Sequence, residues 1–212
     1  YRLTLLDPGL ASSIKSLLRD HVRRALTQDP YWQLWSALRR NTMEMRQQAG
    51  RSLVARQATA LRDRAQALNE GAATLQLDPS VEVPRYQAAV DIHCMPGGYA
   101  SEVCADDVSV GVLYDRGVFL YSMGYGGPHN DDMGRSVCNY VQRTMPEFKP
   151  RRILDMGCSS GHFTTALQEN YPTAAIVGID LSARMLEHAL RTANANGWAW
   201  QLHQMNAEHT SF

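Results

Sequence analysis

The stretch RILDMGCSSGHF, residues 152–163, predicts a buried strand, a glycine-containing turn and the start of a helix. An apolar run begins at Ile153, immediately after a basic, proline-containing segment. Gly157 and Gly161 stand four residues apart. A residue without Cβ lets the backbone turn sharply and lets a ligand lie against it. The free N–H groups of the helix that follows would point at whatever the loop holds.

A second apolar run, residues 174–181, ends in an acid at Asp180. A carboxylate at the end of the second strand of a βαβ unit can accept two hydrogen bonds from ribose hydroxyls. The loop reads Asp-x-Gly-x-x-x-Gly, whereas the nicotinamide fingerprint is Gly-x-Gly-x-x-Gly. Asp155 therefore adds an acid at the end of the first strand. That acid suits a pyrophosphate poorly, but it can attract an ammonium group directly or through water.

A third unit follows the same pattern. Ser182 caps a predicted helix that ends at Gly197, and residues 198–205 predict a third strand with Asn206 after it. Because strands and helices alternate, we predict an α/β, Rossmann-like parallel sheet with right-handed crossovers. The ligand crevice would then lie outside the carboxyl ends of the strands.

Three stretches, residues 155–161, 178–182 and 206–208, together resemble the first three motifs of the class I S-adenosylmethionine-dependent methyltransferases. The resemblance covers residues 150–212. It implies that the glycine loop holds the methionine part of the cofactor, that the acid after the second strand binds the ribose, and that the third stretch borders the adenine. The implied cofactor-binding residues are Asp155, Gly157, Cys158, Gly161, Asp180, Leu181, Asn206, Ala207 and Glu208. The alternative is a nucleotide-free Rossmann half whose glycines only make turns.

In that family the sheet normally has seven strands, and this sequence stops just after the third. We therefore expect either a fragment or only the ordered part of a longer chain. The later strands would carry part of the substrate site. Sequence beyond Phe212 is thus one place where the general base could lie.

The charge and the cysteine content limit which partners and which cellular location we expect for the protein. The net charge of zero argues against a surface built wholly for nucleic acid. Residues 1–80 are nevertheless basic, with 12 Arg and Lys against 7 Asp and Glu. The 4 cysteines form no Cys-x-x-Cys pair, so we expect free thiols, no metal site and a cytoplasmic location. No stretch is apolar enough to span a bilayer, and we expect no membrane association.

The pattern predicts three regions. Residues 1–77 form a helical N-terminal region, whose apolar face is either core or the seam of a homodimer and whose Arg-rich face is either solvated or meets an anionic partner. Residues 78–130 form an irregular connector or lid. Within it, residues 108–114 and 118–121 suggest a hairpin, with a helix as the alternative. Residues 131–212 form the cofactor-binding domain.

The segment before the first strand often covers the methionine end of the cofactor in the resembled family. Here it offers Tyr114 and Tyr125 as cofactor neighbours and His129 as a catalytic base facing the acceptor. Several glycines would let the loop open and close. The alternative is that the tyrosines pack on helices and that His129 merely precedes a helix cap.

These features predict methyl transfer from S-adenosylmethionine to an O, N or C atom of a small molecule, with S-adenosylhomocysteine as product. One alternative is an RNA methyltransferase that uses the Arg-rich helices as a docking arm, although nucleic acid is the less favoured partner because no aromatic-basic signature is present. The other alternative is a non-catalytic protein that keeps the fold for binding or dimerisation.

Overall fold

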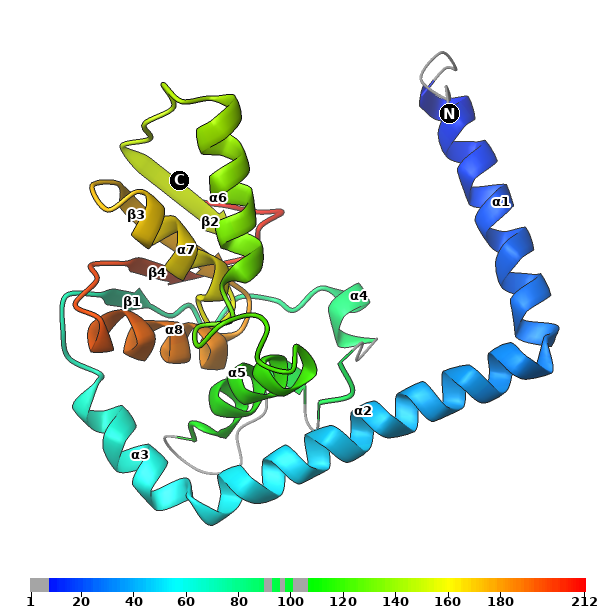
Figure 1. Cartoon of the computed structure of the whole chain (residues 1–212), viewed down its shortest axis with the longest axis horizontal. Coiled ribbons are helices and arrows are strands. Elements are labelled where there is room, and N and C mark those ends of the chain that lie inside the picture. The colour runs from blue at the N-terminus through cyan, green and yellow to red at the C-terminus, as the bar shows by residue number, and fades with distance from the viewer. Residues whose placement is uncertain (1–7, 90–92, 96–97, 101–106) are drawn as a thin grey trace. The chain divides into compact units, whose positions relative to one another are not determined.

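The computed structural model of the chain describes residues 8–89, 93–95, 98–100 and 107–212 (Figure 1). The chain divides into two compact units, one ending at Met45 and the other beginning at Arg46. The first contains α1 (Pro8–Gln28) and the beginning of α2 (Pro30–Arg56). The side chain of Asp29 caps α2 by accepting the N–H of Trp32 at 2.9 Å, and Pro30 occupies the first turn, where its missing N–H costs nothing.

The second unit is built on a four-stranded parallel sheet in the order β1-β4-β3-β2. Its strands are β1 (Thr74–Gln76), β2 (Arg152–Met156), β3 (Ala175–Asp180) and β4 (Gln201–Gln204). The three strands predicted from the sequence are present, and the parallel α/β fold is confirmed. α7 (His162–Asn170) joins β2 to β3, and α8 (Ala183–Ala195) joins β3 to β4.

The strand β1 corrects the prediction of a helical region that runs to residue 77. The helices there end with α3 (Ala58–Ala67), and β1 then pairs with β4 at the edge of the sheet. Asn194 of α8 fixes this connection, because its side chain donates to the carbonyl of Leu68 and accepts the N–H of Ala73. The strand thus depends on a residue that lies far along the sequence.

The core of the sheet lies between α8 and the strands. Trp200, just before β4, is completely buried, and its indole N–H donates to Gln168 of α7 at 3.0 Å. Ile176 of β3 and Leu186 of α8 belong to the same cluster. This packing holds the carboxyl ends of the strands in place, and those ends carry the predicted site.

The segment between β1 and β2 corrects a second expectation. It holds α4 (Arg85–Ala88), the short 3-10 helix η2 (Gly98–Ala100), α5 (Ser109–Tyr121) and α6 (Asp132–Thr144). The predicted hairpin of residues 108–121 is therefore wrong, and its helical alternative is confirmed. Val110 and Leu113 lie three apart on one helical face and pack with Met185 of α8. Gly111 permits this contact, since a Cβ there would lie 2.6 Å from the Cβ of His188.

No helix in the described part of the chain is both long and apolar enough to cross a membrane.

Candidate cofactor site

A half-buried acid, Asp155, lies near the end of β2, as the sequence predicts. The Asp155 carboxylate accepts a hydrogen bond from the Thr164 hydroxyl of α7 at 2.7 Å. Burial raises the pKa of Asp155, and the bond from Thr164 only partly opposes that rise. A carboxylate that is poorly solvated would gain from a cationic group beside it, because the pairing offsets the cost of desolvation.

The glycine turn after β2 is held against β3. The N–H groups of Gly157 and Cys158 donate to the carbonyl of Ile179, at 2.8 and 3.0 Å. Gly157 has a φ of +82°, and no described heavy atom lies within 4 Å of the position that a Cβ would take. The backbone conformation favours glycine, and the space beside the residue is open.

The side chain of Cys158 points into the protein, away from the open space beside Gly157. Its side chain is buried, and its Sγ would lie 2.9 Å from a Cβ built on Gly178. Burial and two nearby acids, Asp180 and Asp155, raise the pKa of the thiol. Cys158 is therefore a protonated core residue that can offer a ligand only its backbone.

Asp180, at the end of β3, ties two loops together. One carboxylate oxygen accepts the N–H of Ser159 at 2.9 Å, and the other accepts the N–H of Ser182 at 2.8 Å. Burial raises the pKa of Asp180, and backbone donors at Ser182, Ser159 and Leu181 act against that rise. A carboxylate has about four acceptor positions, so Asp180 keeps acceptor capacity for a ligand hydroxyl.

The end of β4 completes this edge. The N–H of Met205 donates to the carbonyl of Asp180, and the carbonyl of Leu181 accepts the side chain of Gln204 at 3.0 Å. The Asn206 side chain accepts the N–H of Glu208 at 2.9 Å, and both residues border a cavity of about 510 Å³. Ala207 and Glu208 are exposed. We call the strand-end region defined by Asp155, Gly157, Asp180, Leu181 and Asn206 the crevice.

Residues 153–212 match the sequence model of the family described as "Methyltransferase domain". This segment belongs to the S-adenosylmethionine-dependent methyltransferases. The chain is 53% identical over 49 residues to the malonyl-[acyl-carrier protein] O-methyltransferase of Legionella pneumophila. The aligned stretch covers 23% of this chain and 16% of that protein. The chain is also 44% identical over 45 residues to the trans-aconitate 2-methyltransferase of Rhodopseudomonas palustris, covering 21% and 18%.

A solved structure with a similar arrangement is that of the plantazolicin methyltransferase in complex with S-adenosylhomocysteine. It is 21% identical, covers 46% of this chain and 36% of its own, and has a TM-score of 0.35. The chain spans less than a fifth of the length of the two curated relatives named above. S-adenosylmethionine is the cofactor of the family.

The crevice of this methyltransferase segment suits that cofactor. Open space beside Gly157 can take the methionine part, and Asp155 lies where the ammonium group would need a negative charge. The remaining acceptor capacity of Asp180 suits a ribose hydroxyl. The residues present therefore fit the cofactor that the motifs imply.

Gly161 has a second reason to be glycine. Its φ is +90°, and a Cβ there would lie 2.7 Å from the ring of the buried Trp200. It also occupies the position just before α7. The structure therefore gives Gly161 a role in packing, whereas the sequence suggested direct contact with the cofactor.

Sequence analysis missed a polar network that braces the methyltransferase loop from α5. His162 Nε2 lies 2.9 Å from Asp115 Oδ1 and 3.1 Å from Ser160 Oγ. Burial raises the pKa of Asp115, but His162, His188 and Arg116 outweigh it and lower the pKa to about 2. Both oxygens meet the same ring nitrogen, whereas a nucleophilic triad needs opposite nitrogens, so this is not a hydrolase triad.

Tyr114 joins this network. Its ring stacks on that of His162 with centroids 5.7 Å apart, and it meets Tyr99 edge-on at 5.8 Å. The carbonyl of Tyr99 in turn accepts the hydroxyl of Ser182 at 2.6 Å. Tyr114 thus packs against residues that adjoin the crevice, which leaves its predicted contact with the cofactor open.

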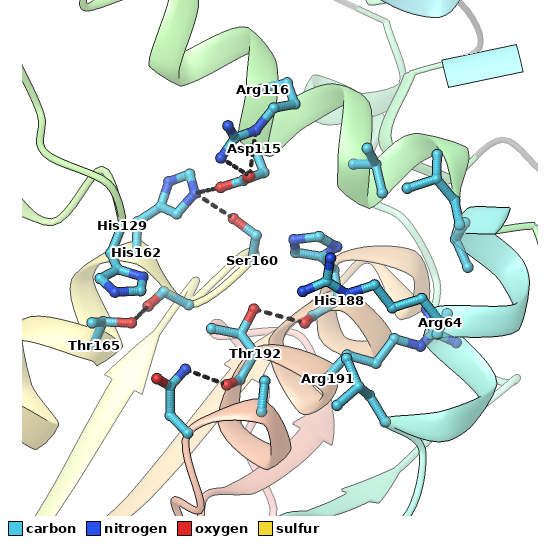
Figure 2. Close-up of a pocket in the computed structure, with 18 of the residues that line it drawn as sticks. Arg64, Asp115, Arg116, His129, Ser160, His162, Thr165, His188, Arg191 and Thr192 are labelled. Atoms are coloured by element: carbon cyan, nitrogen blue, oxygen red, sulfur yellow. Dashed lines mark hydrogen bonds and ion pairs between the residues drawn. The ribbon is translucent and has the colours of Figure 1, made fainter. Parts of the chain in front are cut away.

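The two residues of the predicted lid lie in different surroundings. Tyr125 is 83% exposed. His129 is half-buried and lines a pocket with Ser160, Gly161 and His162 (Figure 2). Asp155 and Asp180 are not among the residues that line this pocket. The structure therefore brings His129, and not Tyr125, to the glycine loop.

Proposed function

We propose that the protein transfers the methyl group of S-adenosylmethionine to an O, N or C atom of a small molecule. The observation that carries the proposal is the crevice itself, where an open glycine turn lies between two half-buried acids at the ends of adjacent parallel strands. The match of residues 153–212 to a methyltransferase family supports the reaction class. The absence of a nucleic-acid signature in the sequence supports a small acceptor.

In this proposal the chain mainly binds and orients. Asp155 would hold the ammonium group and Asp180 the ribose hydroxyls, so that the cofactor adopts one position. When bound, S-adenosylmethionine supplies a sulfonium methyl that is already electrophilic. The protein then has to align the acceptor with that methyl and exclude water. We further propose that His129 takes the proton that an O–H or N–H acceptor releases.

A mass-spectrometric screen of small-molecule pools with the full-length enzyme tests the proposal. The expected result is a product 14 mass units heavier that requires S-adenosylmethionine and is lost in Asp180→Ala. If His129 is the base, His129→Ala lowers turnover far more than cofactor affinity. The base role is excluded if that variant and the parent turn over equally between pH 6 and pH 9.

An RNA acceptor is the second candidate. The ribosomal RNA small subunit methyltransferase C of Hahella chejuensis is 40% identical over 55 residues, covering 26% of this chain and 16% of that protein. An RNA-binding protein would show affinity that falls steeply with salt. Such a salt dependence, together with methylated RNA, would favour this candidate over the small molecule.

A non-catalytic role would show as cofactor binding without any methylated product. A homodimer through the N-terminal helices and a cytoplasmic location also remain predictions.

A further inference from the structure

A second cavity lies on the helical side of the glycine loop (Figure 2). Its volume is about 440 Å³, within the range of small-molecule sites. Helices α3, α5 and α8 and the first turn of α7 form its walls. We call it the helix-lined pocket. Since Asp155, Gly157 and Asp180 do not line it, it is distinct from the crevice.

One part of the helix-lined pocket is apolar. Leu61 and Ala65 contribute from α3, Leu68 contributes from the position just after that helix, and Val112 contributes from α5. All four are buried or half-buried, so they already form a surface that excludes water on one side. A hydrocarbon group placed against them would gain about 25 cal/mol for each Å² removed from water.

The other part carries the guanidinium groups of Arg64 and Arg191, whereas burial lowers the pKa of His188 to about 4 and leaves its ring neutral at pH 7. Figure 2 shows arginine side chains from α3 and α8 beside His188. Arg64 makes no ion pair with any residue that the structure describes. Arg191 is oriented by Asn69, whose side-chain oxygen accepts from its Nε at 2.9 Å. Like charges that share a cavity repel one another unless an anion lies between them.

Asp115 is the single carboxylate among the described residues of the pocket wall, and its own partners are His162 and Arg116. One of its oxygens meets His162 at 2.9 Å, and the other meets Arg116 at 2.9 Å.

We propose that the helix-lined pocket binds a small organic anion, with its apolar body against α3 and α5 and its acidic head beside the guanidinium groups of Arg64 and Arg191. The head is a carboxylate or a phosphate, since both accept forked hydrogen bonds from guanidinium groups. Because His129 lines the same pocket, the anion would lie close to the base proposed above, but binding of the anion requires neither the cofactor nor methyl transfer.

Calorimetry on the full chain tests the proposal, with octanoate, 1-octanol and inorganic phosphate as probes. Octanoate should bind at least about tenfold more tightly than either of the others, because only octanoate has both the charge and the apolar body. Equal binding of octanol would contradict the anionic head. Equal binding of inorganic phosphate would contradict the apolar body. No binding of octanoate at millimolar concentration would overturn the site.

Two variants of α3 test whether octanoate binds in the helix-lined pocket. Arg64→Gln removes the charge from the pocket wall and should weaken octanoate binding at least about fivefold. Arg62→Gln is the matched control, since Arg62 lies on the same helix outside the wall, and it should stay within about twofold of the parent. An unchanged affinity in Arg64→Gln contradicts the proposal. Displacement of octanoate by saturating S-adenosylhomocysteine would also contradict it, because the probe would then occupy the crevice.

Discussion

The crevice and the helix-lined pocket share a single loop, residues 157–162, but differ in charge. The crevice presents Asp155 and Asp180, whereas the pocket presents the guanidinium groups of Arg64 and Arg191 and one carboxylate, Asp115, that is paired with Arg116. The same backbone turn borders the crevice and the helix-lined pocket, so the turn alone does not determine which kind of ligand each of them would bind. The strand ends provide the acids, and the helices α3, α5 and α8 provide the bases.

The two glycines of the loop show the same division. Gly157 faces open space on the crevice side, and Gly161 packs on Trp200 in the core. Both have a positive φ. One glycine leaves room for a ligand, and the other leaves room for the protein's own interior.

The largest expected effect is on folding, at Gly161. Gly161→Ala adds a Cβ 2.7 Å from Trp200 at a φ of +90°, and we expect it to lower the free energy of unfolding by about 3 kcal/mol. Gly197→Ala is the matched control, because Gly197 has a φ of +69° with no neighbour within 4 Å, and it should cost about 1 kcal/mol. Urea unfolding measures both. Equal losses would show that Gly161 serves only the turn.

Gly157→Val should act on binding instead. The branched side chain fills the open space of the crevice, so we expect affinity for S-adenosylhomocysteine to fall at least about a hundredfold, with the fold largely kept. Gly197→Val carries similar backbone strain away from the crevice and should bind normally. If Gly157→Val binds as tightly as the parent, the loop is only a turn.

The acids of the two regions should respond to pH in opposite directions. The folded-state pKa of Asp115, about 2, lies below its usual value of 3.8. Asp115 therefore adds stability above about pH 4 that is lost as the pH falls towards 2, amounting to about 2 kcal/mol for this largely buried group. Asp155 and Asp180 have raised pKa values, so their share of stability falls as the pH rises through 4.

Asp115→Asn should therefore be less stable than the parent at neutral pH and should lose less stability on acidification to pH 2. Asp155→Asn should be more stable than the parent at neutral pH without cofactor. Thermal unfolding between pH 2 and pH 7 measures both differences. Parallel pH profiles for the parent and Asp115→Asn would contradict the stabilising contacts of the Asp115 carboxylate with His162 and Arg116.

The smallest expected effect is at His129. Because His129 lines the helix-lined pocket, His129→Ala should change the affinity for S-adenosylhomocysteine by less than about twofold. Calorimetry with the same protein and ligand concentrations as for Gly157→Val gives the comparison. If the affinity for S-adenosylhomocysteine falls tenfold or more in His129→Ala, then the crevice and the helix-lined pocket form one binding site.

Much of the sheet could be predicted because its signals are local. An apolar run followed by a glycine turn predicted β2 and the start of α7, and the acid that ends the next run marked Asp180. For the stretch that forms α5, the sequence suggested a hairpin with a helix as the alternative, and in the structure Val110 and Leu113 pack on α8. The partner for that face lies more than seventy residues along the chain, so the local pattern could not decide between strand and helix.

Other features have no local signal at all. The three residues of β1 are too few to show a period, and their position depends on Asn194. The pair of Asp115 and His162 spans 47 positions and exists only because α5 packs beside α7. Contacts of this kind follow from the completed fold, so the sequence alone pointed to the crevice and not to the helix-lined pocket.

The most direct test of the crevice is the affinity for S-adenosylhomocysteine, measured by calorimetry in the parent and in Asp180→Ala. Asp180 would provide charge-assisted hydrogen bonds to the ribose worth roughly 1.5–3 kcal/mol, so we predict that the variant binds more than tenfold more weakly. Because Asp180 also accepts two backbone N–H groups, the unfolding midpoint is measured alongside to show that the variant is folded. Unchanged affinity in a folded variant would remove Asp180 from the site and contradict the account.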